Sequence, residues 1–244
     1  MQKIITEDYT ALSAETARRI AEYIRENPGA LLCLAAGDTP LGAFAELIKM
    51  QNAGEVDLSG VYYAGLDEWV GLGYHDKGSC RQVMFDNFYT PAKIPRERIH
   101  VFDGLTDTAP ECAAMNAWLR VHGGLGLALL GVGMNGHVGF NEPLNDDCPE
   151  NLSDADGAIA VELDATTVSV SVKYFGATRP VKTGITLGLS VLRDARELLV
   201  IASGAQKAPI VKRAFYAAPS PTLPASALQN HPRLTLLLDA AAAG

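Results

Sequence analysis

The sequence predicts an α/β protein with a Rossmann-like, mostly parallel sheet that carries helices on both faces. Short apolar segments alternate with longer segments of helical periodicity, which is the order expected of βαβ units. One segment, 126–133, is apolar or glycine at every position, as a central strand buried on both faces requires. The 244 residues contain no internal repeat and no Pro/Gly/Ser-rich linker. We therefore expect a single domain spanning residues 1–244.

The first elements follow from periodicity and from helix-stop signals. Apolar residues recur at helical spacing over 11–27, and the Pro-Gly pair at 28–29 then stops the helix. Residues 31–36 are apolar throughout and predict a buried strand. Pro40 suits the first turn of a second helix, which we expect over 41–50.

The middle of the chain continues the alternation of strands and helices. Residues 61–66 (VYYAGL) are rich in aromatic and branched residues and predict the second strand. Helices are expected over 79–89 and 110–121. Segment 126–133 then supplies the third strand, so that the strands found up to this point are separated by helices.

Three more strands and one helix are expected in the last third of the chain. The strand candidates are 183–189, 197–203 and 234–239, each a short apolar run. Residues 205–218 have helical periodicity, and Pro209 has to lie near the first turn of that helix.

Loops that follow parallel strands are the expected location of a binding site, because ligands in such folds lie beyond the carboxyl ends of the strands. The chain has four such loops. They are 36–40, 66–73, 133–143 and 203–207.

Composition excludes several classes of function. The chain has 28 acidic and 20 basic residues, a net charge of −8 and no run of Lys or Arg. Nucleic acid and anionic membranes bind clustered positive charge, so we expect neither as a partner. The longest strongly apolar stretch, 125–132, is too short to span a bilayer. The N-terminus lacks the apolar core of a signal peptide.

Cysteine and histidine spacing predicts reduced thiols and no metal site. The four cysteines are widely spaced and form no CxxC pair: Cys33, Cys80, Cys112 and Cys148. With no signal peptide, this favours a cytoplasmic protein, and packing in the core is a commoner role for such a cysteine than nucleophilic catalysis. No HxxH pair is present either. Four histidines are isolated from one another: His75, His100, His122 and His231.

The loop at 36–40 has two interpretations. Gly37 lets the backbone approach a ligand closely, and free N–H groups with the Thr39 hydroxyl can hold a phosphate at the start of a helix. Alternatively the loop is a plain tight turn with Thr39 as the N-cap. Asp38 opposes the first interpretation, because a carboxylate repels a phosphate. If the loop holds a phosphate, the Asp38 side chain is expected to point away from it.

The acidic pair Asp67-Glu68 follows the second predicted strand. Adjacent side chains in extended structure point to opposite sides, so only one of the two is expected to enter a cleft. A carboxylate there can transfer a proton. The alternative is a solvated strand end, which is the commoner role of such a pair.

The glycine-rich segment 131–143 (GVGMNGHVGFNEP) contains the strongest functional signal. Its first six residues fit GxGxxG, but the residues that follow do not form the long helix that a dinucleotide site requires. His137 has a free pKa of about 6.5, so it can take and give a proton near neutrality. Glu142 can fix its tautomer. The combination of Asn135, His137 and Glu142 favours function over a merely structural turn.

Three cations are candidates for binding an anion. Lys207 lies in the first turn of a predicted helix, where the helix dipole disfavours a cation unless an anion is bound nearby. Lys173 and Arg179 lie upstream of the strand at 183–189. A solvated surface lysine is the alternative for each.

These loops, taken in order, resemble the glucosamine-6-phosphate deaminase/isomerase family. The motifs are LAAGDTPLGAF, GLDEWVGL, GVGMNGHVGFNEP, TGITLGLSVLRDA and SGAQKA, which together extend from about residue 31 to 208. The pattern most similar to a galactosamine-6-phosphate deaminase/isomerase branch is LDEWV, NGHVGFNEP and RPVKTGITLGL, followed by LPAS (223–226). The related 6-phosphogluconolactonases share the fold but typically have a Ser-Leu-Phe-Pro type ending where this chain has Phe-Asn-Glu-Pro.

The resemblance implies roles for individual residues. Asp67 matches the base that moves a proton between C2 and C1 of the open-chain sugar. His137 matches the ring-opening residue, and Glu142 matches the carboxylate that supports it. The implied phosphate-binding residues are Gly37, Asp38, Thr39 and Lys207, with Lys173 and Arg179 as alternatives for the family's arginine.

Two positions depart from the family pattern. The deaminases have Asp where this chain has Asn135, and a neutral amide can hydrogen-bond to the His but cannot help to charge it. The galactosamine-type branch carries Asn as well. Asp38 replaces a small residue that is usual in the phosphate loop.

The resemblance thus implies an enzyme that converts galactosamine 6-phosphate or glucosamine 6-phosphate to a ketose 6-phosphate and ammonia, without a cofactor. Its partner is a small sugar phosphate. Some members are hexamers, so a homo-oligomer is compatible with the resemblance. The alternatives are a 6-phosphogluconolactonase-type hydrolase and a non-catalytic sugar-phosphate-binding protein.

Overall fold

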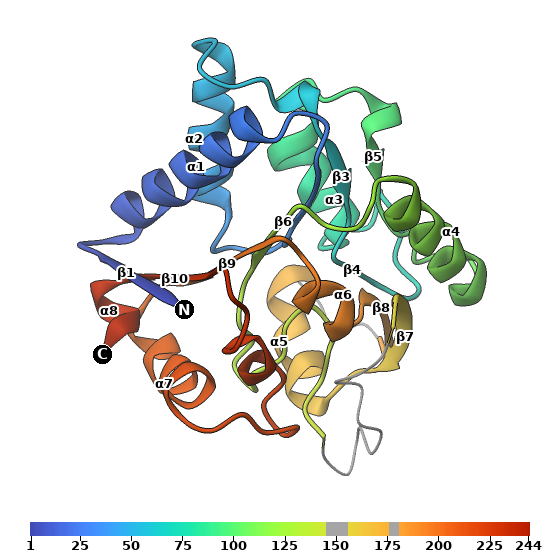
Figure 1. Cartoon of the computed structure of the whole chain (residues 1–244). Helices are drawn as coiled ribbons and strands as arrows, with labels where there is room; N and C mark the ends of the chain where they lie inside the picture. Colours follow the sequence, from blue (N-terminus) through green and yellow to red (C-terminus); the bar gives the residue numbers. More distant parts are fainter. Residues whose placement is uncertain (145–155, 176–180) are drawn as a thin grey trace.

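The computed structural model describes residues 1–144, 156–175 and 181–244 (Figure 1). Its larger sheet contains seven parallel strands in the order β1-β10-β9-β6-β2-β3-β5. Their bounds are β1 Gln2–Thr6, β2 Leu31–Leu34, β3 Tyr62–Ala64, β5 Ile99–His100, β6 Leu127–Leu130, β9 Glu197–Ala202 and β10 Leu234–Asp239. The α/β class with a mostly parallel sheet is the one that the sequence predicts.

Helices cover both faces of this sheet. They are α1 Tyr9–Glu26, α2 Leu41–Asn52, α3 Cys80–Met84, α4 Thr108–Val121, α5 Ala165–Phe175, α6 Leu189–Arg193, α7 Ala208–Tyr216 and α8 Ala240–Ala243. Short 3-10 turns occur at η1 Leu58–Gly60, η3 Arg96–Arg98, η5 Ala205–Lys207 and η6 Pro224–Leu228. Helix α1 begins where the Asp8 carboxylate accepts the N–H of Ala11 at 2.8 Å, and it ends just before Pro28.

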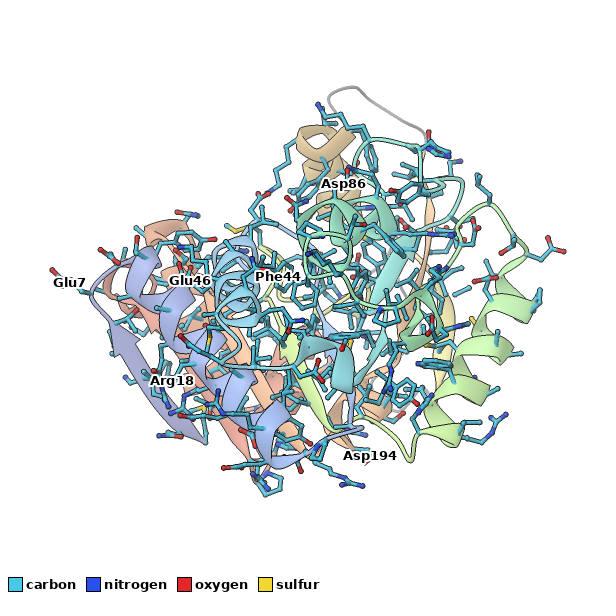
Figure 2. The ribbon with its side chains drawn as sticks, turned by 90° about the horizontal axis from the view of Figure 1, so that it is seen from above. Glu7, Arg18, Phe44, Glu46, Asp86 and Asp194 are labelled. Atoms are coloured by element: carbon cyan, nitrogen blue, oxygen red, sulfur yellow. The ribbon has the colours of Figure 1, made fainter. Side chains whose placement is uncertain are left out.

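The core lies on both sides of the sheet because successive strand residues point to opposite faces. In β2, Leu31 and Cys33 pack in one cluster with residues of α4, α6 and α7. Leu32 and Leu34 pack in the other cluster with residues of α1 and α2. Figure 2 shows Phe44 of α2 in the interior, whereas Glu7 lies at the edge of the molecule.

A second sheet, antiparallel and of three strands, was not expected. Its order is β4-β8-β7, with bounds β4 Asp67–Trp69, β7 Ala158–Glu162 and β8 Thr183–Leu187. The strand expected at 183–189 therefore forms, but in this small sheet rather than in the parallel one. Trp69 packs with its ring centroid 4.5 Å from that of Phe140 and 5.3 Å from that of Phe175. This aromatic cluster fastens the small sheet to the glycine-rich loop and to α5.

Most other predicted elements form within a few residues of their expected bounds. The helix expected over 79–89 is instead a short α3 followed by a π-helical turn, Phe85–Tyr89. The edge strands β1 and β5 and the whole segment from β7 through α5 were not predicted. The single-domain organisation stays a prediction.

Because the strands of the larger sheet are parallel, their carboxyl ends share one edge. The loops after β2, β3, β6 and β9 therefore emerge side by side at that edge. In the described part of the chain no helix combines the length and apolar character needed to cross a membrane.

Candidate active site

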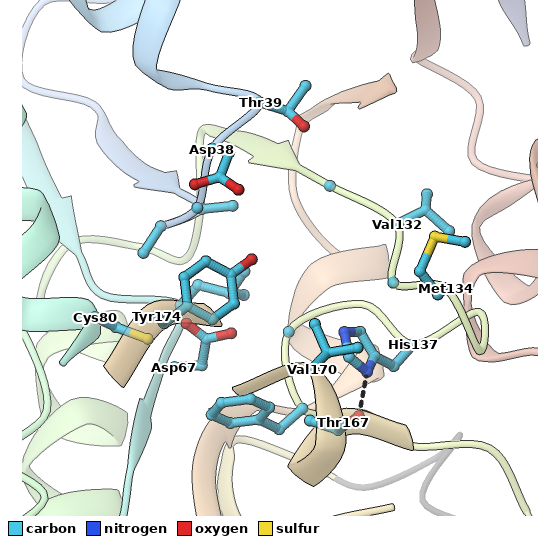
Figure 3. A pocket seen from close by; sticks show the side chains of 18 of the residues that line it. Asp38, Thr39, Asp67, Cys80, Val132, Met134, His137, Thr167, Val170 and Tyr174 are labelled. Atoms are coloured by element: carbon cyan, nitrogen blue, oxygen red, sulfur yellow. Dashed lines mark hydrogen bonds between the residues drawn. The ribbon is translucent and has the colours of Figure 1, made fainter. Parts of the chain in front are cut away.

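A pocket of about 470 Å³ opens at the carboxyl ends of the parallel strands (Figure 3). Its walls come from the four loops singled out in the sequence, together with residues of α3 and α5. The pocket brings Asp67, Asn135 and His137 together with the candidate phosphate loop. Two of the three candidate cations, Lys173 and Lys207, line the same pocket. Residues up to 172 positions apart in the chain thus share one cavity, Ala35 and Lys207 among them.

Asp67 and Glu68 point to opposite sides of β4, as strand alternation predicts. Asp67 lines the pocket, whereas the Glu68 side chain is buried behind it. The Glu68 carboxylate accepts the Ser79 hydroxyl at 2.7 Å and three backbone N–H groups, those of Trp69, Cys80 and Arg81, at 2.9 to 3.0 Å. Glu68 therefore fixes the start of α3 against β4, and with it the position of Cys80.

Burial raises the pKa of Asp67 to about 6, although the Cys80 thiol donates a hydrogen bond to its carboxylate and the charge of His137 also lowers it. Figure 3 shows the Cys80 sulfur beside the Asp67 carboxylate. Burial also raises the pKa of the Cys80 thiol well above its usual range, so this cysteine is a donor rather than a nucleophile. A carboxylate that titrates near 6 is suited to exchanging a proton at neutral pH.

His137 follows a turn in which two positions, 133 and 136, require glycine. A Cβ on Gly133 would lie 2.3 Å from the imidazole ring, and Gly136 has a φ of +94°. The loop is closed by the Gly133 N–H, which donates to the His137 carbonyl at 2.9 Å. The glycines of the segment therefore serve to seat the imidazole ring, not to hold a dinucleotide.

The Nδ1 atom of His137 has two oxygen neighbours, one in its own loop and one in α5. Glu142 Oε2 lies 3.2 Å from it and Thr167 Oγ1 lies 2.9 Å from it. The Glu142 side chain is fully buried and that of His137 is 22 % exposed. The ring is thus anchored on one edge and open to the cavity on the other.

Asn135 joins these groups into one network. Its amide nitrogen donates to Glu142 Oε2 at 2.9 Å and to Asp164 Oδ1 at 3.2 Å, and its oxygen accepts the His137 N–H at 3.1 Å. An amide has two N–H donors, so both are used between two carboxylates. An aspartate at this position would bring three carboxylates together, which explains why a neutral residue suits this chain.

The opposite end of the pocket is formed by the loop 36–40. Gly37 has a φ of +136°, which favours glycine, and open space where its Cβ would be. The backbone N–H groups of residues 37–39 have no hydrogen-bond partner among the described residues. The Tyr9 hydroxyl contacts the carbonyl oxygens of Asp38 and Thr39 at 3.3 and 3.1 Å and accepts the Gly42 N–H. The loop is therefore held from behind by α1, with free donors available.

Asp38 does not turn away from the cavity as expected. Its carboxylate lines the pocket and forms an ion pair with Lys173 at 3.0 Å. The pair is exposed, with side-chain exposures of 69 % for Asp38 and 51 % for Lys173. The charge of Asp38 is thus compensated by a cation from α5 instead of being removed from the site.

Lys207 approaches the same end of the pocket from η5. Its Nζ donates to the Val132 carbonyl oxygen at 2.6 Å, a partner that the sequence did not suggest. Burial and the neighbouring Lys173 charge lower its pKa. Two lysines thus lie close enough to influence each other, as a site for a doubly charged anion requires. Arg179, the third candidate cation, lies outside the described residues.

Sequence reasoning missed four residues of the site: Tyr9, Cys80, Asp164 and Thr167. Two of them belong to α5 or directly precede it, and the composition of α5 conceals the helix. Its residues, ATTVSVSVKYF, alternate β-branched and small polar side chains, which is typical of a strand. The acidic segment at the end of β7, AVELD (160–164), gave no functional signal.

No group of three or more His, Cys, Asp or Glu side chains that could hold a metal ion occurs in residues 1–144, 156–175 and 181–244. The cysteines within these ranges are free thiols: Cys33, Cys80 and Cys112. Cys148 lies outside them.

Comparison with a family model and with known proteins finds related sequences over nearly the whole chain. The family model described as glucosamine-6-phosphate isomerases/6-phosphogluconolactonase matches residues 6–236. The glucosamine-6-phosphate deaminase of Clostridium perfringens is 39% identical over 246 residues, which are 100% of this chain and 98% of that protein. That of Lachnoclostridium phytofermentans is 37% identical over 239 residues, or 97% and 98% of the two chains.

Solved structures divide into two groups. A monomeric glucosamine-6-phosphate deaminase superposes with a TM-score of 0.92 at 31% identity and covers 100% of this chain and 99% of its own. The 6-phosphogluconolactonase of Thermotoga maritima superposes with a TM-score of 0.79 at 18% identity and covers 98% and 99%. The second likeness concerns the fold alone.

Proposed function

The chain belongs to the family of glucosamine-6-phosphate isomerases and 6-phosphogluconolactonases, and from this premise we propose that it is an amino-sugar-6-phosphate deaminase/isomerase. It converts an amino-hexose 6-phosphate and water to a ketose 6-phosphate and ammonia. The observation that carries the proposal is the pocket itself. A titratable carboxylate and an imidazole share one cavity with two lysines and a loop of free N–H donors.

The full-length relatives favour a deaminase over a lactonase. Relatives described as glucosamine-6-phosphate deaminases reach 39% identity over the whole chain, whereas the structures described as 6-phosphogluconolactonases share 14% to 19%. The choice between these activities also depends on chemistry. Isomerisation of an aldose to a ketose requires a proton transfer between two carbon atoms, whereas lactone hydrolysis does not, and a carboxylate inside the pocket such as Asp67 is suited to that transfer.

The substrate phosphate is proposed to lie on residues 37–39 and between Lys207 and Lys173. The free N–H groups of this loop donate to the phosphate oxygens, and the two ammonium groups neutralise its charge. Lys173 then exchanges Asp38 for the phosphate, or contacts both. Binding the sugar at this remote end orients the reacting carbons at the other.

Ring opening is proposed to use His137. With Nδ1 anchored on its far edge, Nε2 faces the cavity and can take the proton of the anomeric hydroxyl and deliver it to the ring oxygen. Glu142 stabilises the imidazolium that forms in between, as the acidic member of a triad does. The imidazole of His137 therefore ends this step with the same number of protons with which it began.

The isomerisation step is proposed to use Asp67. Its carboxylate removes the proton from C2 of the open-chain sugar and returns it to C1, while a proton of the C2 amine passes to O1. The C1 aldehyde thereby becomes an alcohol and the C2 amine becomes an imine. Water then adds to C2 and ammonia leaves, which yields the ketone. A positioned acid or base of this kind contributes about 10²- to 10⁴-fold.

The sugar is proposed to be galactosamine 6-phosphate or glucosamine 6-phosphate. The motifs of the chain resemble a galactosamine-type branch, whereas the relatives reported above are described as glucosamine-6-phosphate deaminases. The two substrates differ only in the orientation of the C4 hydroxyl.

The test is release of ammonia from both amino sugars, measured side by side with hydrolysis of 6-phosphogluconolactone. We expect ammonia and ketose in equal amounts from one or both sugars and no lactone hydrolysis above background. Lactone hydrolysis without ammonia release would favour the hydrolase. Thermal stabilisation by the sugar phosphates without turnover of any substrate would favour a non-catalytic binding protein.

A further inference from the structure

The first turn of α5 lies in the wall of the pocket, against the Nδ1 edge of the His137 ring. Thr167 Oγ1 is 2.9 Å from His137 Nδ1, a contact drawn in Figure 3. The preceding residue Asp164 is 5 % exposed and Thr167 is 4 % exposed. A hydroxyl buried in direct contact with a ring nitrogen influences which of the two nitrogens carries the proton.

The surroundings of Nδ1 favour a hydrogen on that nitrogen. Glu142 Oε2 lies 3.2 Å away, and its fully buried carboxylate would repel an Nδ1 lone pair at that distance. With a hydrogen on Nδ1, Thr167 Oγ1 is the nearer of two acceptors. The neutral ring then presents a bare Nε2, which is the form able to accept a proton.

Asp164 fixes the place of Thr167. Its Oδ1 accepts the Thr166 N–H at 2.8 Å, and its carbonyl accepts the Val168 N–H at 3.0 Å, so it begins α5 as a helix cap does. The same Oδ1 accepts the Asn135 amide at 3.2 Å. One carboxylate oxygen therefore fastens the start of α5 to the loop that carries His137.

We propose that Thr167 and Asp164 are positioning residues for His137. Thr167 keeps the proton of the neutral ring on Nδ1 and holds the ring plane, and Asp164 fastens α5 so that the Thr167 hydroxyl stays within reach. The inference rests on the proposed function, in which Nε2 accepts the proton of the anomeric hydroxyl. In this proposal, helix α5 positions His137 together with the glycine-rich loop.

The substitutions Thr167→Val and Thr167→Ser separate the hydroxyl from the shape of the side chain. Valine keeps the volume and removes the acceptor, and serine keeps the acceptor. Loss of one hydrogen bond predicts a kcat about tenfold lower in Thr167→Val with KM unchanged, and within about threefold of wild type in Thr167→Ser. Ser169→Ala, which removes an exposed hydroxyl of the same helix that donates to Thr166, serves as the matched control.

A second readout does not depend on turnover. Nitrogen-15 NMR of the ring, assigned with a His137→Gln variant, reports the tautomer directly. We expect the Nδ1–H form in the wild type and in Thr167→Ser. In Thr167→Val, and in Asp164→Ala, which removes the oxygen that accepts the Thr166 and Asn135 N–H groups, we expect a mixture of the two tautomers or a changed histidine titration.

The outcomes distinguish the two proposals. If the wild type releases no ammonia, the proposed function fails, and the tautomer measurement alone decides the inference. If the wild type is active but Thr167→Val keeps both its kcat and the wild-type nitrogen signature, the inference is overturned. A fall in kcat that Thr167→Ser does not restore, with an unchanged nitrogen signature in every variant, also overturns it, because the effect is then one of packing.

Discussion

The two ends of the pocket are built in different ways. At the His137 end, side chains on three segments form a buried network around one imidazole, with Glu142, Asp164 and Thr167 each 5 % exposed or less. At the other end, the loop 37–39 offers backbone donors beside an exposed Asp38–Lys173 pair. The first end is arranged before any ligand arrives, whereas the second has charges that can exchange partners. This is the division expected where one end performs proton transfer and the other recognises a phosphate.

The largest effect is expected from Asp67→Asn. Removing the proposed base predicts a loss of turnover of about 10³-fold or more, since a positioned acid or base contributes up to about 10⁴-fold. Binding of the sugar phosphate should persist, because the phosphate end is untouched. Ammonia release and a ligand-induced thermal shift measure the two properties separately.

The control for this variant is Asp107→Asn, which alters an exposed carboxylate at the start of α4 whose side chain makes no capping hydrogen bond. It should behave as the wild type. Undiminished ammonia release by Asp67→Asn would eliminate Asp67 as the base.

The next effect concerns the phosphate end. Lys207→Met keeps the length of the side chain and removes its charge. A charge-assisted hydrogen bond is worth about 1.5–3 kcal/mol, so KM for the sugar phosphate should rise about 10- to 100-fold with a smaller change in kcat. A large fall in kcat at unchanged KM would instead assign Lys207 to the reacting end and remove the contrast between the two ends.

The pH dependence of activity tests the buried end. Asp67 acts as a base only when ionised, and burial raises its pKa to about 6. The value of kcat/KM measured for the free enzyme should therefore fall tenfold per pH unit below about 6. An acid limb near the ordinary aspartate pKa, about 3.9, would show that the carboxyl is solvated.

The same raised pKa predicts a stability effect. The ionised form of Asp67 is disfavoured in the folded protein, so its contribution to stability is full below the unfolded pKa and is lost as pH rises through about 6. The asparagine side chain is uncharged, as is the protonated carboxyl group of Asp67. Asp67→Asn should then be more stable than the wild type at pH 8, on the order of 2 kcal/mol, with a difference that shrinks toward pH 4. Urea unfolding at the two pH values measures this, and an equal difference at both would refute it.

The smallest effect is expected from Asp38→Asn. Exposed ion pairs contribute about 0–1 kcal/mol, so stability should change little. Lys173 is released from its partner and a negative charge leaves the phosphate end, which predicts a KM up to about fivefold lower. A higher KM would mean that Asp38 orients Lys173 for the substrate rather than competing with the phosphate.

Much of the fold could be predicted because the parallel strands are apolar on both faces and the helices that cover them are periodic. The small sheet could not, because β4 is only Asp67–Trp69 and its partners lie more than 90 residues away. Helix α5 was missed because its alternating Val, Thr and Ser residues have strand propensity. It forms a helix where Thr167, Ser171 and Phe175, spaced four residues apart, face the interior.

Some residues of the candidate site could likewise be predicted from the sequence, and others could not. The sequence could group one set of site residues because each of them follows a predicted strand: Gly37, Asp67, His137, Glu142 and Lys207. Asp164 and Thr167 come from the unpredicted segment, and their contact with His137 exists only in three dimensions. The pairing of Asp38 with Lys173 also depends on a helix that the sequence did not indicate.

The most direct test of the proposed reaction follows the hydrogen atoms at C1 of the product. Glucosamine 6-phosphate and galactosamine 6-phosphate are each incubated with the wild-type protein in deuterated water, and the ketose is examined by NMR. A single carboxylate on one face of the sugar predicts ammonia and ketose in equal amounts. Deuterium that exchanges from the solvent onto the Asp67 carboxyl between the two proton transfers should enter only one of the two C1 positions. Ketose labelled equally at both positions, or no ketose from either sugar, would contradict the assignment of Asp67 and of the deaminase reaction.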